Sequence, residues 1–327
     1  MDFLSADSLP WLHGPQQRLR DALTARRLPH ALLLLSVPGL GAELLANWIT
    51  ALALCESGAR RPCGGCASCV LLRADNHPDS YVVRVEDDAQ QIKIEQIRGL
   101  SDSLVLSSFR GGYKVGIIEG AEALNANGAN AFLKTLEEPT DDTLLIMIAK
   151  PSHRLPATVA SRCLRLPLHS PTKPAALGWL EERRPGVHNW DAALALAGGA
   201  PLKALELQAA GITALEEDMQ ASLRQLSADA VDVTLLAERW VKSDPLLRLT
   251  WLENWITRRV HAYLGAAPSL QSAEPVRLPA ALLKPKIQAL FELLDAAREL
   301  RRLASTGLNQ QLALEALLLG GRAALAT

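Results

Sequence analysis

The stretch LLLLSVPGLGAELLA, from Leu32 to Ala46, decides the fold class of this chain. It has the pattern of a buried apolar strand, a turn that contains Gly39 and Gly41, and the start of a helix. Phosphate-binding loops are built in this order, because the backbone N–H groups at a helix N-terminus attract anions. The stretch therefore raises the question of whether the chain carries a working nucleotide site.

Further β-type runs follow along the first half of the chain and alternate with segments of helical periodicity. The runs are Ala31–Leu35, Ser80–Val85, Lys114–Glu119, Thr143–Ala149 and Leu164–Leu168, and the helical segments include Ile94–Leu106 and Asn125–Glu138. Alternation of this kind predicts a parallel sheet with crossover helices. Beyond Pro167 the strand signals end, so the fold class is α/β plus all-α.

We expect three domains. A P-loop-type α/β domain spans residues 1–168, a small helical domain spans 169–209, and a C-terminal helical domain spans 210–327. In the last of these, Pro285 suits the first turn of a helix, because its missing N–H costs nothing there. Apolar residues then recur at helical spacing, at Ile287, Leu290, Leu294 and Ala297, and we expect Trp240, Trp251 and Trp255 to be core or interface anchors.

Composition excludes several function classes. The chain has 34 Lys plus Arg against 35 Asp plus Glu, and it carries neither a basic nor an acidic tail. This balance disfavours autonomous binding to nucleic acid or membranes. The N-terminus lacks a basic region followed by an apolar one, and the apolar runs are short, so we expect no signal peptide, no membrane span and a cytoplasmic location.

The opening loop departs from the nucleotide-binding pattern GxxxxGK[ST]. Gly39 and Gly41 remain in the turn, but Ser36 replaces the first glycine. Ala42 stands at the position of the lysine that contacts the phosphates, and Glu43 at the position of the hydroxyl that binds Mg²⁺. A carboxylate there repels phosphate. We therefore expect no ATP hydrolysis at this loop.

A second NTPase motif is also incomplete. In VGIIEGAEAL, Glu119 ends an apolar strand where a metal-binding Asp would stand, and Gly120 occupies the place of the glutamate that activates water. The incomplete loop and the incomplete second motif both predict that the chain does not hydrolyse ATP. The loop alone is also compatible with a strand-turn-helix that has no nucleotide ancestry.

Four cysteines are closely spaced. Cys63, Cys66 and Cys69 occur in CGGCASC, and Cys55 lies upstream. Four thiolates at such spacing form a closed tetrahedral Zn²⁺ site in a module over about residues 55–70. A redox pair or an iron–sulfur cluster is the alternative. We interpret Cys163 as a small buried residue outside this site.

A third possibility is a zinc module that binds nucleic acid by itself. The sequence between Arg60 and Arg73 contains only three arginines and no aromatic residue. Such a surface offers little for phosphate or base contacts.

Several motifs together resemble the clamp-loader subunits of the AAA+ ATPases, most closely their bacterial delta-prime branch. They are LPHALLLLSVPGLG, the cysteine cluster followed by NHPD, NANGANAFLKTLEEPTDDTLLIMIA from Asn125 to Ala149, LPATVASRC, and LNQQLALEALLL from Leu308 to Leu319. The resemblance covers the first 168 residues and returns in the last helix.

The resemblance implies an AAA+ domain, a lid and a collar domain in a five-subunit arc, with ATP bound between neighbours. It implies that Arg162 of the SRC triplet reaches into a neighbour's ATP site as a trans-acting arginine finger, a role suited to a planar, permanently charged guanidinium. The implied partners are the motor (gamma/tau) and delta subunits, and, through the assembly, the sliding clamp and primed DNA.

The losses at Ala42, Glu43 and Gly120 fit the delta-prime branch, which has lost hydrolysis and kept the finger. The resemblance thus implies a non-hydrolysing stator within a DNA polymerase III holoenzyme. An ATP-hydrolysing motor subunit of the same fold is the alternative. We interpret Glu137 and Glu138 as a helix end before Pro139 rather than a catalytic pair, because adjacent helical positions point about 100° apart.

Overall fold

The computed structural model describes residues 4–58, 60–86, 89–151, 155–186, 189–264, 280–304 and 308–325. Contacts divide the chain into two compact units. The first comprises Met1–Trp179 with Gly199–Lys203, and the second comprises Leu180–Gly198 with Ala204–Thr327. The finer division into three domains at residues 168 and 209 stays a prediction.

The first unit is built around a five-stranded, fully parallel sheet. Its strands are β1 (Ala31–Leu35), β2 (Ser80–Val83), β3 (Lys114–Glu119), β4 (Thr143–Ala149) and β5 (Leu164–Pro167). They lie in the order β2-β3-β4-β1-β5, with Leu33 opposite Met147 and Ile117 opposite Ile146. All seven residues of β4 are buried, as a central strand covered on both faces requires. The predicted parallel sheet is confirmed.

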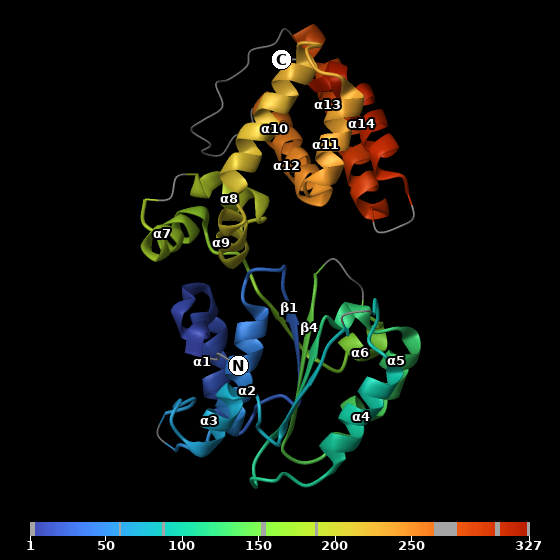
Figure 1. Cartoon of the computed structure of the whole chain (residues 1–327). Coiled ribbons are helices and arrows are strands. Elements are labelled where there is room, and N and C mark those ends of the chain that lie inside the picture. The colour runs from blue at the N-terminus through green and yellow to red at the C-terminus, as the bar shows by residue number, and fades with distance from the viewer. Residues whose placement is uncertain are drawn as a thin grey trace. The chain divides into compact units, whose positions relative to one another are not determined.

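Helices cover both faces of this sheet (Figure 1). One side carries α1 (His13–Thr24), α2 (Ala42–Leu54) and α3 (Ala67–Arg73), and the other carries α4 (Ile94–Val105), α5 (Ala126–Glu137) and α6 (Ala157–Ala160). Short 3-10 helices occupy Leu4–Ser8, Pro10–Leu12 and Ala121–Ala123. The carboxyl end of β1 leads into the turn that contains Gly39 and Gly41. The carboxyl end of β3 leads into Gly120.

Local sequence signals account for where helix α5 begins and ends. The Asn125 side chain accepts a hydrogen bond from the Gly128 backbone N–H at 2.8 Å and caps the N-terminus. Phe132 is 0% exposed and belongs to the core between the sheet and α4. The helix ends at Glu137, shortly before Pro139, as predicted.

The second unit is helical throughout its described residues (Figure 1). Its helices are α8 (Trp190–Leu196), α10 (Ile212–Ser227), α11 (Val233–Lys242), α12 (Pro245–Tyr263), α13 (Ala280–Leu303) and α14 (Gln310–Leu325). Two further helices, α7 (Lys173–Arg183) and α9 (Pro201–Ala209), begin in the first unit and end in the second. Trp240 and Trp251 are fully buried core residues, whereas Trp255 is half-buried beneath the Arg259 guanidinium.

One expectation for this unit is wrong. Pro285 lies inside α13, which begins at Ala280, and not in its first turn. Proline removes a single backbone N–H and already has a helical φ angle. Its position close to the helix start, where few intrahelical hydrogen bonds have formed, lets the helix continue on its N-terminal side. No helix within the described residues combines the length and apolar character needed to cross a bilayer.

Phe132→Ala tests the core beneath α5. Removing a fully buried aromatic ring leaves a cavity, and we expect the free energy of unfolding to fall by about 3–5 kcal/mol. Denaturant unfolding of the whole chain measures this change. Lys134→Ala, on the exposed side of the same helix, is the matched control, and an equal effect of both substitutions would contradict this placement.

Candidate functional site

The β1–α2 loop has the shape that the sequence predicts. Gly39 and Gly41 have φ values of +86° and +85°, in the left-handed region that favours glycine. A side chain at Gly39 would meet the 199–203 segment, because its Cβ would lie 2.6 Å from the backbone nitrogen of Lys203. The Leu202 N–H also donates to the Gly39 carbonyl at 3.1 Å. The turn at Gly39 therefore packs against the 199–203 segment.

The residues at the lysine and hydroxyl positions of the nucleotide-binding pattern lie in the first turn of α2. Ala42 is the first residue of α2 and is 2% exposed, so it brings no charge to the loop. Glu43 is exposed in the first turn of that helix. The Ser36 hydroxyl donates to the neighbouring Val37 carbonyl at 2.9 Å. The loop thus offers backbone groups and a carboxylate, but no cation at the lysine position.

Glu119 ends β3, and Gly120 follows it with a φ of +70°. Burial raises the pKa of the Glu119 carboxyl; nearby Arg84 opposes this rise and Glu43 adds to it. Glu119 borders a cavity of about 430 Å³. The other lining residues are Asn47, Leu72, Asp75, His77, Ser80, Val82 and Arg84. Gly120 supplies no carboxylate, so the second motif lacks its water-activating group.

Arg162 lies two residues after the end of α6 and forms an ion pair with a residue of α5. Its guanidinium contacts the Glu137 carboxylate at 2.5 Å and donates to the Thr158 carbonyl at 2.8 Å. Its side chain remains 36% exposed. From the sequence, Glu137 is expected only to end a helix, yet this ion pair joins the two motifs, NAFLKTLEEP and SRC, that carried the resemblance. The pair positions the arginine at the surface.

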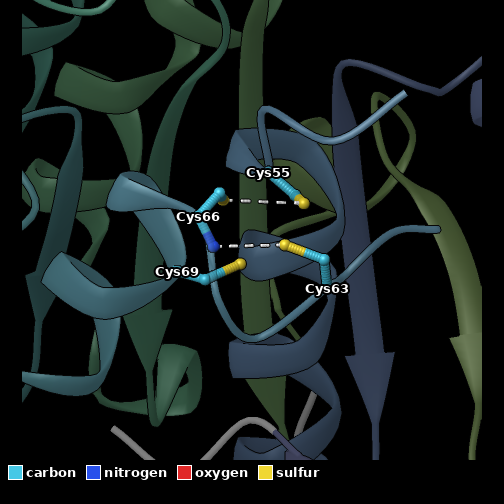
Figure 2. Close-up of side chains that lie close together, drawn as sticks. All are labelled: Cys55, Cys63, Cys66 and Cys69. Carbon is cyan, nitrogen blue, oxygen red and sulfur yellow. Dashed lines mark hydrogen bonds between the residues drawn. The ribbon is translucent and has the colours of Figure 1, made fainter. Parts of the chain in front are cut away.

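The four predicted cysteines converge (Figure 2). Their sulfur atoms all lie within 4.8 Å of one another, and the Cys55 and Cys66 sulfurs are 3.9 Å apart. Zinc–sulfur bonds of about 2.3 Å in a tetrahedron place sulfurs about 3.8 Å apart, so the cluster has the size to hold a metal ion. Cys66 immediately precedes α3, at its N-cap position, and Cys69 lies within the helix.

Backbone groups prepare one of these thiols for metal binding. The Cys66 N–H donates to the Cys63 sulfur at 3.3 Å. N–H groups of Gly65 and Cys66 lower the pKa of Cys63 to about 6, because they stabilise the thiolate. Burial instead raises the pKa of Cys69, whose charge needs a nearby cation. Cys163 lies apart, with its S–H directed to the Val159 carbonyl.

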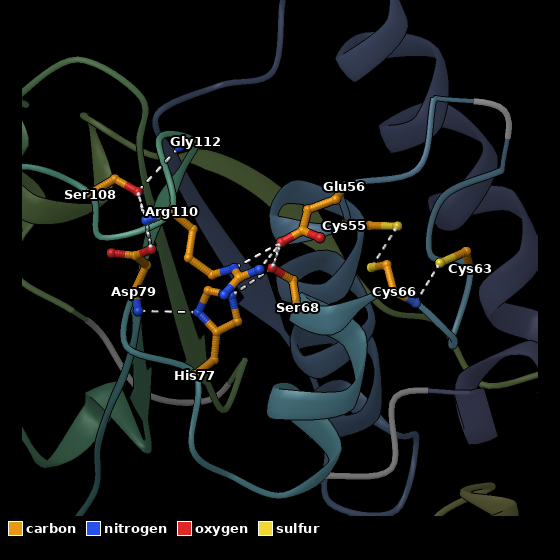
Figure 3. A network of polar contacts seen from close by, with 10 residues as sticks. All are labelled: Cys55, Glu56, Cys63, Cys66, Ser68, His77, Asp79, Ser108, Arg110 and Gly112. Atoms are coloured by element: carbon orange, nitrogen blue, oxygen red, sulfur yellow. Dashed lines mark hydrogen bonds and ion pairs between the residues drawn. The ribbon is translucent and has the colours of Figure 1, made fainter.

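A polar network extends from this cluster (Figure 3). Glu56 and Ser68, each next to a cysteine of the cluster, are joined by a 2.8 Å hydrogen bond. Hydrogen bonds from Ser68 and Arg110 hold the pKa of the Glu56 carboxyl below its usual range. No sequence motif marks Glu56, Ser68 or Arg110. Glu56 and Ser68 carry one signal, their adjacency to Cys55 and Cys69, and Arg110 carries none.

Comparison with known proteins covers most of the chain. Residues 13–172 match the family described as DNA polymerase III, delta subunit, and residues 214–322 match DNA polymerase III, delta subunit, C terminal. DNA polymerase III subunit delta' of Pseudomonas aeruginosa is 37% identical over 76% of each chain. The subunit delta' of Yersinia pestis is 32% identical over 97% of this chain and 96% of its own. A gamma subunit-related protein from Thermotoga maritima has 18% identity and a TM-score of 0.48, covering 94% of this chain and 99% of that one.

Glu119→Gln tests the environment of the second motif. Because the folded state raises the pKa of this carboxyl, the folded chain binds its proton more tightly than the unfolded chain does. The stability that Glu119 contributes is therefore present at low pH and lost as the pH rises through the raised pKa. We expect the variant to melt a few degrees above the native chain at neutral pH, and the difference to vanish near pH 4.

Thermal unfolding at the two pH values measures this effect. Glu95→Gln, at an exposed position of α4, is the control and should leave the pH dependence unchanged. A difference between Glu119→Gln and the native chain that is the same at both pH values would contradict the assignment.

Proposed function

The chain belongs to the delta-prime family of DNA polymerase III, and from this membership we propose that it acts as a non-hydrolysing stator of the clamp loader. It contributes no ATPase activity of its own and supplies an arginine to the ATP site of a neighbouring motor subunit. Turnover at that neighbouring site then drives loading of the sliding clamp onto primed DNA during replication.

The observation that carries this proposal is the contrast between the loop and the arginine. Ala42, buried at the start of α2, gives the loop no cation, and Glu43 adds a negative charge beside it. Arg162 keeps a partly exposed guanidinium held by Glu137. A chain that has lost phosphate-binding charge from its own loop but presents an ordered arginine at its surface is suited to act on another subunit's nucleotide.

A motor subunit of the same fold is the second candidate. It requires a lysine where Ala42 stands and a glutamate where Gly120 stands. Neither is present, so this candidate has less support.

The proposed partners follow from the same reading. The motor (gamma/tau) subunit receives Arg162, and the helical second unit joins the corresponding helices of the delta and motor subunits in a collar. The clamp and primed DNA are engaged through the assembly, in the cytoplasm. The near-neutral charge of the chain supports shared rather than autonomous DNA binding.

Arg162→Ala in the reconstituted clamp loader tests the arginine. An arginine finger neutralises charge on the transferring phosphoryl group, so we expect DNA- and clamp-stimulated ATP turnover to fall by at least about tenfold. The assembly should still form, because an exposed ion pair contributes at most about 1 kcal/mol. Size-exclusion chromatography checks assembly and steady-state turnover checks the activity.

Arg165→Ala provides the matched control, since Arg165 is an exposed arginine of β5, three residues further along the chain. It should retain native turnover. If Arg162→Ala assembles and turns over ATP like Arg165→Ala, then Arg162 has a structural role and the stator supplies no finger.

We also propose that Cys55, Cys63, Cys66 and Cys69 hold a structural Zn²⁺. Four thiols in one cluster leave no open position for a substrate. The metal supplies positive charge that stabilises four thiolates and ties the chain around α3 to the end of α2. It contributes folding free energy and no catalysis. A redox pair at the start of α3 uses only Cys66 and Cys69 and leaves the other two cysteines unexplained.

Metal content separates these possibilities. We expect about one zinc ion per chain for the native protein and for Cys163→Ser, and a loss of bound zinc with lowered thermal stability for Cys63→Ser. Elemental analysis of purified chains measures the content. Iron in place of zinc, or equal zinc in both variants, would contradict the assignment.

A further inference from the structure

Two residues beside the cysteine cluster form a direct bridge. Glu56 follows Cys55 and Ser68 precedes Cys69, and the Ser68 hydroxyl donates to Glu56 Oε1 at 2.8 Å (Figure 3). A metal held by both cysteines fixes the backbone on each side of this hydrogen bond. The relative position of Glu56 and Ser68 therefore depends on the cluster.

The bridge holds a residue from a distant part of the sequence. Arg110 Nε donates to Glu56 Oε1 at 2.8 Å, and one terminal nitrogen of Arg110 approaches the same oxygen at 2.6 Å. Arg110 lies in the segment of residues 106–112, between α4 and β3. One carboxylate next to a cysteine ligand thus receives both the serine and the arginine.

A second path reaches the same segment through His77 and Asp79. The Asp79 N–H donates to His77 Nδ1 at 3.1 Å, so His77 carries its hydrogen on Nε2 and donates it to Ser68 Oγ, also at 3.1 Å. His77 is 5% exposed and Asp79 is 1% exposed. A buried, fully connected chain of this kind has little freedom to rearrange.

Asp79 then organises the backbone of the segment. Its carboxylate accepts hydrogen bonds from the Phe109 N–H at 2.8 Å, the Arg110 N–H at 3.1 Å and the Ser108 hydroxyl at 3.1 Å. The Gly112 N–H in turn donates to the Ser108 hydroxyl at 3.1 Å. Both paths from the cysteine cluster therefore end on one turn.

We infer that the metal state of the cysteine cluster controls the order of the 106–112 segment, through Glu56 to Arg110 and through Ser68, His77 and Asp79. This inference rests on the proposed metal site. The segment and the last residue of α4 carry Val105, Leu106 and Phe109, whose exposed fractions are 69%, 58% and 73%. Metal binding thus fixes where a set of exposed apolar side chains lies, at a place remote in sequence from the cysteines.

Coupling between two sites is reciprocal, which makes the inference testable from either end. We expect Arg110→Gln to weaken zinc binding about 5-fold or more, measured in the full chain by competition with a chromophoric chelator. We expect Glu56→Gln, with zinc bound, to raise hydrogen exchange about 10-fold or more at the Phe109 and Arg110 amides, while the β4 amides stay protected. Asp102→Asn, an exposed residue of α4, is the control for both measurements.

Each outcome has a definite meaning. Zinc affinity of Arg110→Gln within twofold of native, or native exchange at residues 109 and 110 in Glu56→Gln, overturns the coupling and leaves the metal site standing. A native chain that binds no zinc overturns both. Native behaviour of Asp102→Asn beside changed behaviour of the two network variants supports the coupling.

Discussion

The turn between β1 and α2 is the constraint on which the first unit depends. Gly39 and Gly41 both have positive φ, and the 199–203 segment packs directly against Gly39. A side chain at Gly41 would lie 2.8 Å from Leu9. The glycines therefore have a packing role that does not require a nucleotide. The glycine turn is thus compatible with Ala42 and Glu43 at the positions where the nucleotide-binding pattern has a lysine and a hydroxyl.

The end of β3 and the residue Arg162 show a similar contrast between backbone position and side-chain chemistry. Glu119 keeps its place at the end of β3, but Gly120 beside it serves only to turn the chain. The Arg162 guanidinium is partly exposed and contacts the Glu137 carboxylate of α5. The proposed function rests on this contrast together with membership of the delta-prime family.

The alternation of apolar runs and helical segments predicted the strands and the parallel sheet, because burial leaves a local pattern in the sequence. The spacing of the cysteines predicted their cluster in the same way. No local pattern could predict the packing of Lys203 on Gly39. The same holds for the pairing of Arg110 with Glu56, since these two residues lie 54 positions apart along the chain. Such contacts depend on tertiary packing. The first turn predicted at Pro285 is wrong because the helix extends N-terminally to Ala280, and near its start few intrahelical hydrogen bonds exist for proline to interrupt.

The measurement that tests the central claim most directly is ATP turnover by the purified chain alone, with Mg²⁺ and with primed DNA present. A loop without a phosphate-binding lysine and a β3 end without a water-activating glutamate should give no turnover above the buffer rate. Turnover that persists through purification and disappears on substitution within residues 36–43 would contradict the account, because the loop would then be a working nucleotide site.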